Sequence, residues 1–210
     1  MAKTNRSRRR SRPLALGAFV LVAGAIGVLT WSALSDGSSE PTPAPSPTPS
    51  PEVSVLPIPQ SPSEVGVPLA EAGCTPVEEP RLQRLRLTST DEHPEYSSNP
   101  PTSGWYQGPP PPALYYVPIG PEPAVGAMAK GDVIVWHTGL TYDETQLLHG
   151  LFIYFKDEAI TGASGEELGL EEPIVLTAWG KLQRCEKISG EAIATFFTTH
   201  RGKGPLTESA

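Results

Sequence analysis

The sequence has few of the residues and none of the short patterns from which catalytic sites are usually recognised. Its 210 residues include only two cysteines and four histidines. We find no G-x-S-x-G, H-E-x-x-H, G-x-x-x-x-G-K-[ST] or G-x-G-x-x-G pattern, so nothing indicates a serine hydrolase, a zinc protease, a P-loop or a dinucleotide site. Adjacent carboxylates such as Glu166 and Glu167 are typical of solvated loops rather than of a glycosidase pair. The sequence therefore gives no signature of an enzyme.

Basic residues are scarce after the first 12 positions. Six of the 16 Lys and Arg residues precede position 15, whereas all 23 Asp and Glu residues follow position 35. The part from Asp36 onward therefore has ten basic residues against 23 acidic ones, a net charge of about −13. Because phosphate binding needs a basic surface, we expect no nucleic-acid partner.

Charged residues are absent from Pro13 to Leu34, which is almost entirely apolar or small. At about 1.5 Å per residue, a helix over residues 14–34 spans roughly 31 Å, the thickness of the hydrocarbon core of a bilayer. The basic residues 1–13 before it predict a cytoplasmic N-terminus and an extracytoplasmic remainder. We therefore expect a single-pass protein of the cell membrane. The alternative is a signal peptide cleaved after Ser35, although signal cores are usually shorter, about 7–15 residues.

Proline and glycine are abundant, with 25 and 20 residues. Proline alternates with Ser, Thr and Ala over residues 35–68, a composition that buries too little apolar surface to fold. We expect a disordered linker in the polyproline-II conformation, which could hold the following domain roughly 90 Å from the membrane at about 3.1 Å per residue.

Residues 69–205 are enough for one folded domain, followed by a short tail at 206–210. Apolar runs rich in β-branched and aromatic residues predict strands, and partial alternation predicts an edge strand. The expected strands are residues 81–88 at the edge, 132–137, 150–155 and 173–180. After Ser189, a candidate N-cap, Ile193, Phe196 and Phe197 recur at helical spacing up to Gly202. We expect an α+β fold with a small, mostly antiparallel sheet and one C-terminal amphipathic helix.

The two cysteines, Cys74 and Cys185, both follow the apolar segment and would lie in an oxidising compartment. A disulfide is the default prediction there. A reactive thiol or a metal-binding pair is the alternative, but no C-x-x-C spacing supports it.

The segment N-P-P-T-S-G contains two consecutive prolines, which fix the backbone and make a stiff loop. The loop consists of Asn99, Pro100, Pro101, Thr102, Ser103 and Gly104. Four aromatic residues follow among further prolines: Trp105, Tyr106, Tyr115 and Tyr116. These rings either pack against the prolines to bury apolar area or form the wall of a binding site.

Four segments, H-P-E-Y-S-S-N-P-P-T-S-G-W-Y, L-L-H-G-L-F-I-Y-F, T-A-W-G-K and T-H-R-G-K-G-P, occur in this order. In order and spacing they resemble a bacterial envelope family, the domain of unknown function 3105. The pattern of that family is Y-x-S-N-P-P-T-S-G-P-H, then V-H-S-L-E-H-G before a strand, then A-W-G and R-G-K-G-P-E. The resemblance covers roughly residues 93 to 205 and implies an exported, usually membrane-tethered domain, with no established reaction.

This chain departs from the family pattern at its polar residues. Trp105 and Tyr106 stand where the family has P-H, Thr145 where it has the first His of H-S-L-E-H-G, and Leu148 where it has the Glu. In this alignment only His149 remains. If those family residues form a metal or acid/base site, most of it is lost here.

Three histidines define a second hypothesis. His137 ends one expected strand and His149 precedes the next, so antiparallel pairing would bring both imidazoles to one end of the sheet, where His93 could join them. Three histidines can hold zinc or copper.

From the stiff loop and its aromatic residues we predict a binding or scaffolding module of the envelope. The module contacts its partner, a protein or a small molecule, through the four aromatic residues and needs no cofactor. The alternative is a metal-binding protein or metal-dependent enzyme.

Overall fold

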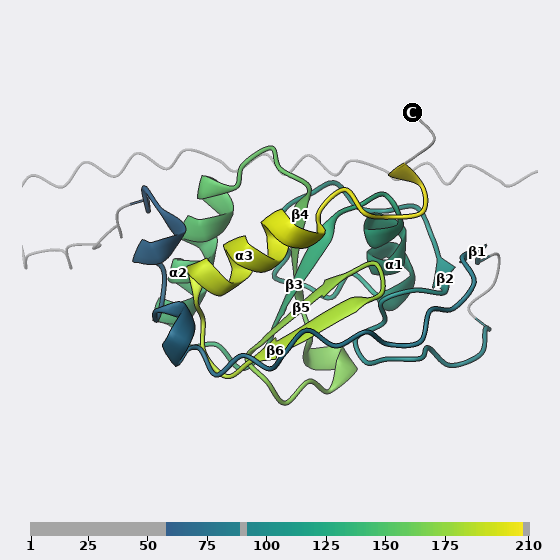
Figure 1. Cartoon of the computed structure of the whole chain (residues 1–210), viewed down its shortest axis with the longest axis horizontal. Coiled ribbons are helices and arrows are strands. Elements are labelled where there is room, and N and C mark those ends of the chain that lie inside the picture. The colour runs from purple at the N-terminus through teal and green to yellow at the C-terminus, as the bar shows by residue number, and fades with distance from the viewer. Residues whose placement is uncertain (1–57, 89–91, 208–210) are drawn as a thin grey trace, which may run out of the picture. The chain divides into compact units, whose positions relative to one another are not determined.

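The computed structural model describes residues 58–88 and 92–207, which contain the folded part of the chain (Figure 1). The predicted cytoplasmic tail, the predicted membrane helix and most of the predicted linker lie outside the described residues. Within the described ranges, no helix is both long enough and apolar enough to span a membrane.

A four-stranded mixed sheet forms the centre of the domain. Its strands are β3 (Val133–His137), β4 (Ile160–Ser164), β5 (Ile174–Ala178) and β6 (Lys181–Cys185), in the order β4-β3-β5-β6. β3 runs parallel to β4 and antiparallel to β5, and β5 runs antiparallel to β6. The runs at 132–137 and 173–180 are therefore confirmed as strands. A β3–β4 pair that runs parallel needs a crossover connection, which an antiparallel hairpin does not.

That crossover is helix α2 (Tyr142–Tyr154), and it overturns the prediction of a strand at 150–155. Thr141 caps the helix in a reciprocal capping box with Glu144, so the N-terminal signal is strong. Leu148, Leu151 and Phe152 are buried at helical spacing, which places one apolar stripe against the sheet. The short apolar run was compatible with either element, and the cap upstream of it decides for the helix.

Helix α1 (Pro121–Ala129) was also missed by the sequence analysis. It begins with Pro121 in the first turn, where a missing N–H leaves no bond unmade. Its residues from Ala124 to Ala129 are all buried, so it shows no amphipathic pattern that would reveal a helix.

Helix α3 (Gly190–His200) confirms the predicted C-terminal helix. The Ser189 side chain accepts a hydrogen bond from the backbone N–H of Ala192, as an N-cap does. Ile193, Phe196 and Phe197 are each at most 2% exposed, and Figure 1 shows the helix lying across the sheet.

Helices cover both faces of the sheet, so the domain is α+β with two apolar clusters. Val133, Val135 and Leu176 point to the face that packs on α2 and α3. Ile134, Trp136 and Val175 point to the opposite face, where α1 packs. This alternation is the period of two that strands impose on their side chains.

Short elements complete the fold. They are the 3-10 turns η1 (Pro62–Glu64), η2 (Leu69–Glu71) and η3 (Glu166–Leu168), and a parallel pair of two-residue strands, β1 (Arg86–Leu87) and β2 (Trp105–Tyr106). The predicted edge strand at 81–88 is thus a strand at Arg86–Leu87. The folded part includes residues before Leu69, since Val65 is 2% exposed and Gly66 forms a bridge with Ser189.

The predicted disulfide between Cys74 and Cys185 is confirmed. It joins the segment before β1 to the last residue of β6, across 111 positions of sequence. In the chain-entropy account, closing a loop of that length stabilises a fold by about 4–5 kcal/mol.

Candidate functional site

The N-P-P-T-S-G loop faces inward. Pro100 to Gly104 are buried, and Thr102 and Ser103 are fully buried. The Ser103 hydroxyl accepts a hydrogen bond from the backbone N–H of Gln83 (2.9 Å), and the Thr102 carbonyl accepts one from Gly180 (3.0 Å). The loop therefore joins the 81–88 segment to the turn between β5 and β6 and acts as a frame.

Only the first residue of this loop reaches the surface. The Asn99 side chain donates to the carbonyl of Leu168 (2.8 Å), and its own carbonyl accepts from Arg184 (2.8 Å). The Asn99–Pro100 peptide bond is cis, which the sequence analysis did not anticipate. A shallow cavity of about 510 Å³ lies beside Asn99, and its lining consists of Glu95, Tyr96, Ser97, Ser98, Asn99, Pro101, Pro121 and Leu168.

His93 is held between an aromatic ring and two acceptors. Its ring stacks on Trp105 with 5.2 Å between centroids and a 7° interplanar angle. Nδ1 lies 2.7 Å from the Pro94 carbonyl and Nε2 lies 3.0 Å from a Glu122 carboxylate oxygen. Both partners are acceptors, so the arrangement favours the doubly protonated ring. The hydrogen bond to the Pro94 carbonyl, and after it the Glu122 carboxylate, raises the pKa of His93, whereas burial lowers it.

His137 and His149 do not lie on paired strands as predicted, because the segment after His149 is helical, yet both rings lie beside the Tyr115–Tyr116 segment. His137 ends β3, with Nε2 3.2 Å from the Tyr115 carbonyl, and burial lowers its pKa. His149 lies on α2, with its ring centroid 6.5 Å from that of Tyr116. In residues 58–88 and 92–207, no three His, Cys, Asp or Glu side chains are grouped so that they could hold a metal ion.

The four aromatic candidates separate into two pairs with different neighbours. Trp105 and Tyr106 form β2 and are half-buried. The Tyr115 hydroxyl donates to the Pro111 carbonyl (2.8 Å), which braces the proline-rich loop. Tyr116 is 55% exposed and is the one of the four with a largely free ring. As a group they do not form a single wall.

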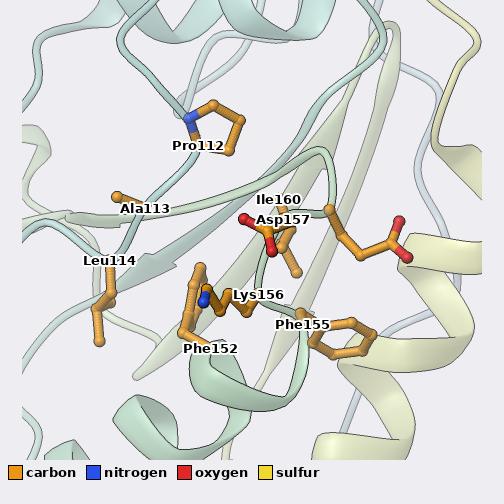
Figure 2. A pocket seen from close by; sticks show the side chains of 9 residues that line it. Pro112, Ala113, Leu114, Phe152, Phe155, Lys156, Asp157 and Ile160 are labelled. Carbon is orange, nitrogen blue, oxygen red and sulfur yellow. The ribbon is translucent and has the colours of Figure 1, made fainter.

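A groove does lie beside Tyr116. Two adjoining cavities of about 390 and 250 Å³ share Leu114, Phe152 and Lys156. Figure 2 shows Pro112, Ala113 and Leu114 along one side of the larger cavity, with Phe152 and Phe155 from the end of α2 on the other. The complete lining consists of Pro112, Ala113, Leu114, Tyr116, His149, Phe152, Ile153, Phe155, Lys156, Asp157, Glu158 and Ile160.

The groove combines an apolar floor with charges of both signs at its end. Ile160 is 2% exposed and Phe152 is 9% exposed, whereas Ile153 on the rim is 39% exposed. Lys156 and Asp157 lie at the end of α2, where Asp157 adopts a positive φ of 68°. Neighbouring Glu158 is ion-paired with Arg201 (2.6 Å). This arrangement can bind an apolar side chain and orient a flanking polar backbone.

The groove could not be predicted from the sequence because the segment that forms α2 was expected to be a strand. Three of the lining residues, His149, Phe152 and Ile153, belong to that helix, and they face a common side only when the segment is helical. The T-Y-D-E capping box at Thr141–Glu144 was the signal that could have shown the helix.

These features define an α+β domain with helices on both faces of a mixed sheet, a fold class that by itself specifies no activity. The family model described as "Protein of unknown function (DUF3105)" matches residues 88–210, more than half of the chain. The chain therefore belongs to the DUF3105 family. No curated protein and no solved structure matches it.

A second segment of the chain also fits one part of the family pattern. In the family pattern, V-H-S-L-E-H-G directly precedes a strand, but Gly150 lies within helix α2. The segment VGAMAKG, residues 125–131, begins with Val and ends with Gly. Only Asp132 separates it from β3. In that alignment Gly126, Ala129 and Lys130 stand at the places of the family's His, Glu and His.

With this alignment the motifs converge around α1. A Cβ on Gly126 would lie 2.1 Å from the carbonyl oxygen of Gln107, which directly follows β2. The Leu206 N–H donates to the Ala129 carbonyl (2.8 Å), and the Gly202 N–H donates to the Gly131 carbonyl (2.7 Å). Close backbone packing thus surrounds α1.

Proposed function

We propose that this chain is a membrane-anchored binding module that captures an extended, partly apolar segment of another envelope protein. Residues 14–34 are the single-pass anchor, the N-terminus is cytoplasmic, and the folded domain is held outside the membrane on its proline-rich linker. The length and charge pattern of the N-terminal region support this topology.

The groove beside α2 is the observation that carries the binding role. Tyr116 and Ile153 stand on its rim with 55% and 39% of their surfaces exposed. An aromatic ring and an aliphatic side chain on the rim of a cavity with an apolar floor are typical of recognition surfaces.

A polypeptide fits the groove better than a compact small molecule does. The two cavities adjoin along one side of α2, so the surface is elongated and open rather than enclosed. Lys156 and Asp157 could pair with backbone or terminal groups of a bound segment at the far end. No cofactor is needed for such binding, and the metal-dependent alternative has no ligand group among the described residues to build on.

Site-specific photo-crosslinking in living cells tests the binding role. A crosslinking amino acid placed at Tyr116 should give one discrete adduct, whereas the same group at Tyr142, which is 76% exposed and outside the groove, should give none. Ile153→Glu should abolish the Tyr116 adduct by placing a charge on the apolar rim. Equal adducts from both positions, or an adduct that survives Ile153→Glu, would contradict the proposal.

Labelling of introduced cysteines tests the topology separately. A membrane-impermeant thiol reagent should label Lys187→Cys on intact cells and Ser7→Cys only after permeabilisation, because the two positions flank the predicted anchor. The reverse pattern would overturn the orientation and leave the groove proposal to be judged on its own experiment.

A further inference from the structure

A second surface lies away from the groove, on the segment that leads into β1. Arg81, Arg84 and Arg86 are exposed, and we call them the arginine strip. Among the ion pairs of the described residues, Lys181, Arg184 and Arg201 each bind a carboxylate, but none includes an arginine of the strip. Three cations within six residues have no ion pair among the described residues, although the chain from Asp36 onward has a net charge of about −13.

Two leucines in the same segment are also exposed. Leu82 is 60% exposed and Leu87 is 69% exposed. The arginine strip is thus a mixed surface of cations and aliphatic side chains, and such a surface suits a ligand that offers both anions and apolar groups.

The segment is held firmly from behind. The backbone N–H of Gln83 donates to the Ser103 hydroxyl, that of Arg86 to the Gly104 carbonyl, and that of Thr88 to the Tyr106 carbonyl. Leu85 packs against the apolar cluster beneath. Because the backbone is already fixed, a ligand would not have to order it, which favours binding.

Among the described residues, no strand pairs with the outer edge of β1. β1 is one of only two strands in its small sheet. Arg86 and Thr88 direct their N–H groups inward to the β2 side, so the N–H of Leu87 between them points away from it. An edge of this kind can accept another extended chain.

We propose that the arginine strip binds an acidic, extended polypeptide segment whose carboxylates alternate with apolar residues. The carboxylates pair with the arginines, the apolar residues cover Leu82 and Leu87, and the backbone adds to the edge of β1. The same arginines oppose edge-to-edge pairing of two copies, because like charges would then meet. A phosphate polymer or an anionic bilayer would use the arginines but not the strand edge.

Binding of a defined peptide to the full chain in detergent micelles tests this proposal. The probe is a labelled eight-residue peptide of alternating Glu and Val, with a Lys and Val peptide as its control. The Glu peptide should bind, its affinity should fall as salt is added, and the Lys peptide should not bind. Absence of binding by the Glu peptide at low salt would overturn the proposal.

Variants locate the interaction. Arg84→Glu combined with Arg86→Glu should weaken binding by roughly tenfold or more, because like charges would face the peptide. The control Lys187→Glu reverses an exposed basic residue elsewhere and should leave the affinity unchanged. Thermal melting of both variants confirms folding, and an equal loss in the control would contradict the assignment.

Amide exchange separates strand addition from general attraction to anions. On binding the peptide, the Leu87 amide should become protected, while polyphosphate and anionic vesicles should leave it unprotected. Tight binding of those two probes, or peptide binding without Leu87 protection, would show a general anion surface and overturn the proposal. Ile153→Glu in the groove should not affect any of these results.

Discussion

The surroundings of α1 and the surroundings of α2 differ in what their sequences reveal and in what their surfaces offer. The α1 side contains the recognisable family motifs, yet its loop residues Thr102 and Ser103 are fully buried and hydrogen-bonded within the domain. The α2 side has a less distinctive sequence, yet Tyr116 and Ile153 are exposed there on the rim of a groove. In this chain, the conspicuous motif marks the frame and the plainer segment marks the surface available for binding.

The difference has a physical cause. A loop with two prolines and a positive-φ glycine can serve as a rigid insert between neighbouring segments, and Gly104 at φ 118° sits close to the Gln83 side chain. Such a loop constrains the sequence strongly without contacting any ligand. A helix that borders a groove needs only a few apolar positions, so its sequence is less constrained.

The largest expected effect on stability comes from removing the disulfide between Cys74 and Cys185. Replacing Cys74 and Cys185 together by serine should lower the free energy of unfolding by about 4–5 kcal/mol, since the loop they close spans 111 positions. Denaturant unfolding of the wild type with and without reductant is the measurement. If reduction leaves the midpoint unchanged, the bridge does not stabilise the domain.

The next largest effect on stability should come from a substitution in the tightly packed surroundings of α1. Gly126→Ala places a Cβ within 2.1 Å of the Gln107 carbonyl oxygen and should destabilise the domain by about 1–3 kcal/mol, although alanine favours helix formation. Gly108→Ala is the matched control, because nothing lies within 4 Å of its Cβ. Thermal unfolding of the two variants is the measurement. Similar melting temperatures for Gly126→Ala and Gly108→Ala would contradict close packing around α1.

A smaller, pH-dependent effect should separate His93 from His137. The pKa of His93 is raised above 6.5, so its contribution to stability is complete below that pH and is lost as pH rises through the folded-state pKa. The pKa of His137 is lowered by burial, so it is neutral in both states above 6.5, and stability is lost as pH falls through its folded-state pKa.

Titration of the imidazole signals by NMR measures both values directly. Replacing His93 with Gln should remove the loss of stability on the alkaline side, and replacing His137 with Gln should remove the loss on the acidic side. Equal pKa values for the two rings would show that their surroundings do not differ in this respect.

The smallest effect on stability should come from the groove. Tyr116→Ala should change the free energy of unfolding by no more than about 0.5 kcal/mol, because more than half of the side chain is already exposed. Denaturant unfolding checks this value, and crosslinking from a probe at Ile153 checks binding, which we expect to be lost. A large destabilisation would place Tyr116 with the frame.

Much of the fold could be predicted from the sequence, and the misses have specific causes. The strands near 132–137 and 173–180, helix α3 and the disulfide were correct because apolar runs, a cap and the number of cysteines each point to one answer. Helix α2 was read as a strand because a six-residue apolar run fits either element. Helix α1 was missed because it is buried along nearly its whole length.

The site was less predictable than the fold. Which side chains meet depends on the crossover through α2, and the antiparallel pairing expected between the strand ending at His137 and a strand at 150–155 does not exist. The four aromatics were grouped by closeness in sequence, but Tyr106 belongs to β2 whereas Tyr116 borders α2. Tyr116 and His149 were both nominated from the sequence and found beside the groove.

The position of the disulfide also determines how the domain would respond to mechanical tension. A pull between the two ends of the folded part would pass from Cys74 directly to Cys185 through the sulfur atoms. The 110 residues enclosed by that bridge, which include β1 to β5 with α1 and α2, would bear none of this load. Residues 58–73 and helix α3 would yield first, so the arginine strip, which lies inside the bridge, would not be stretched.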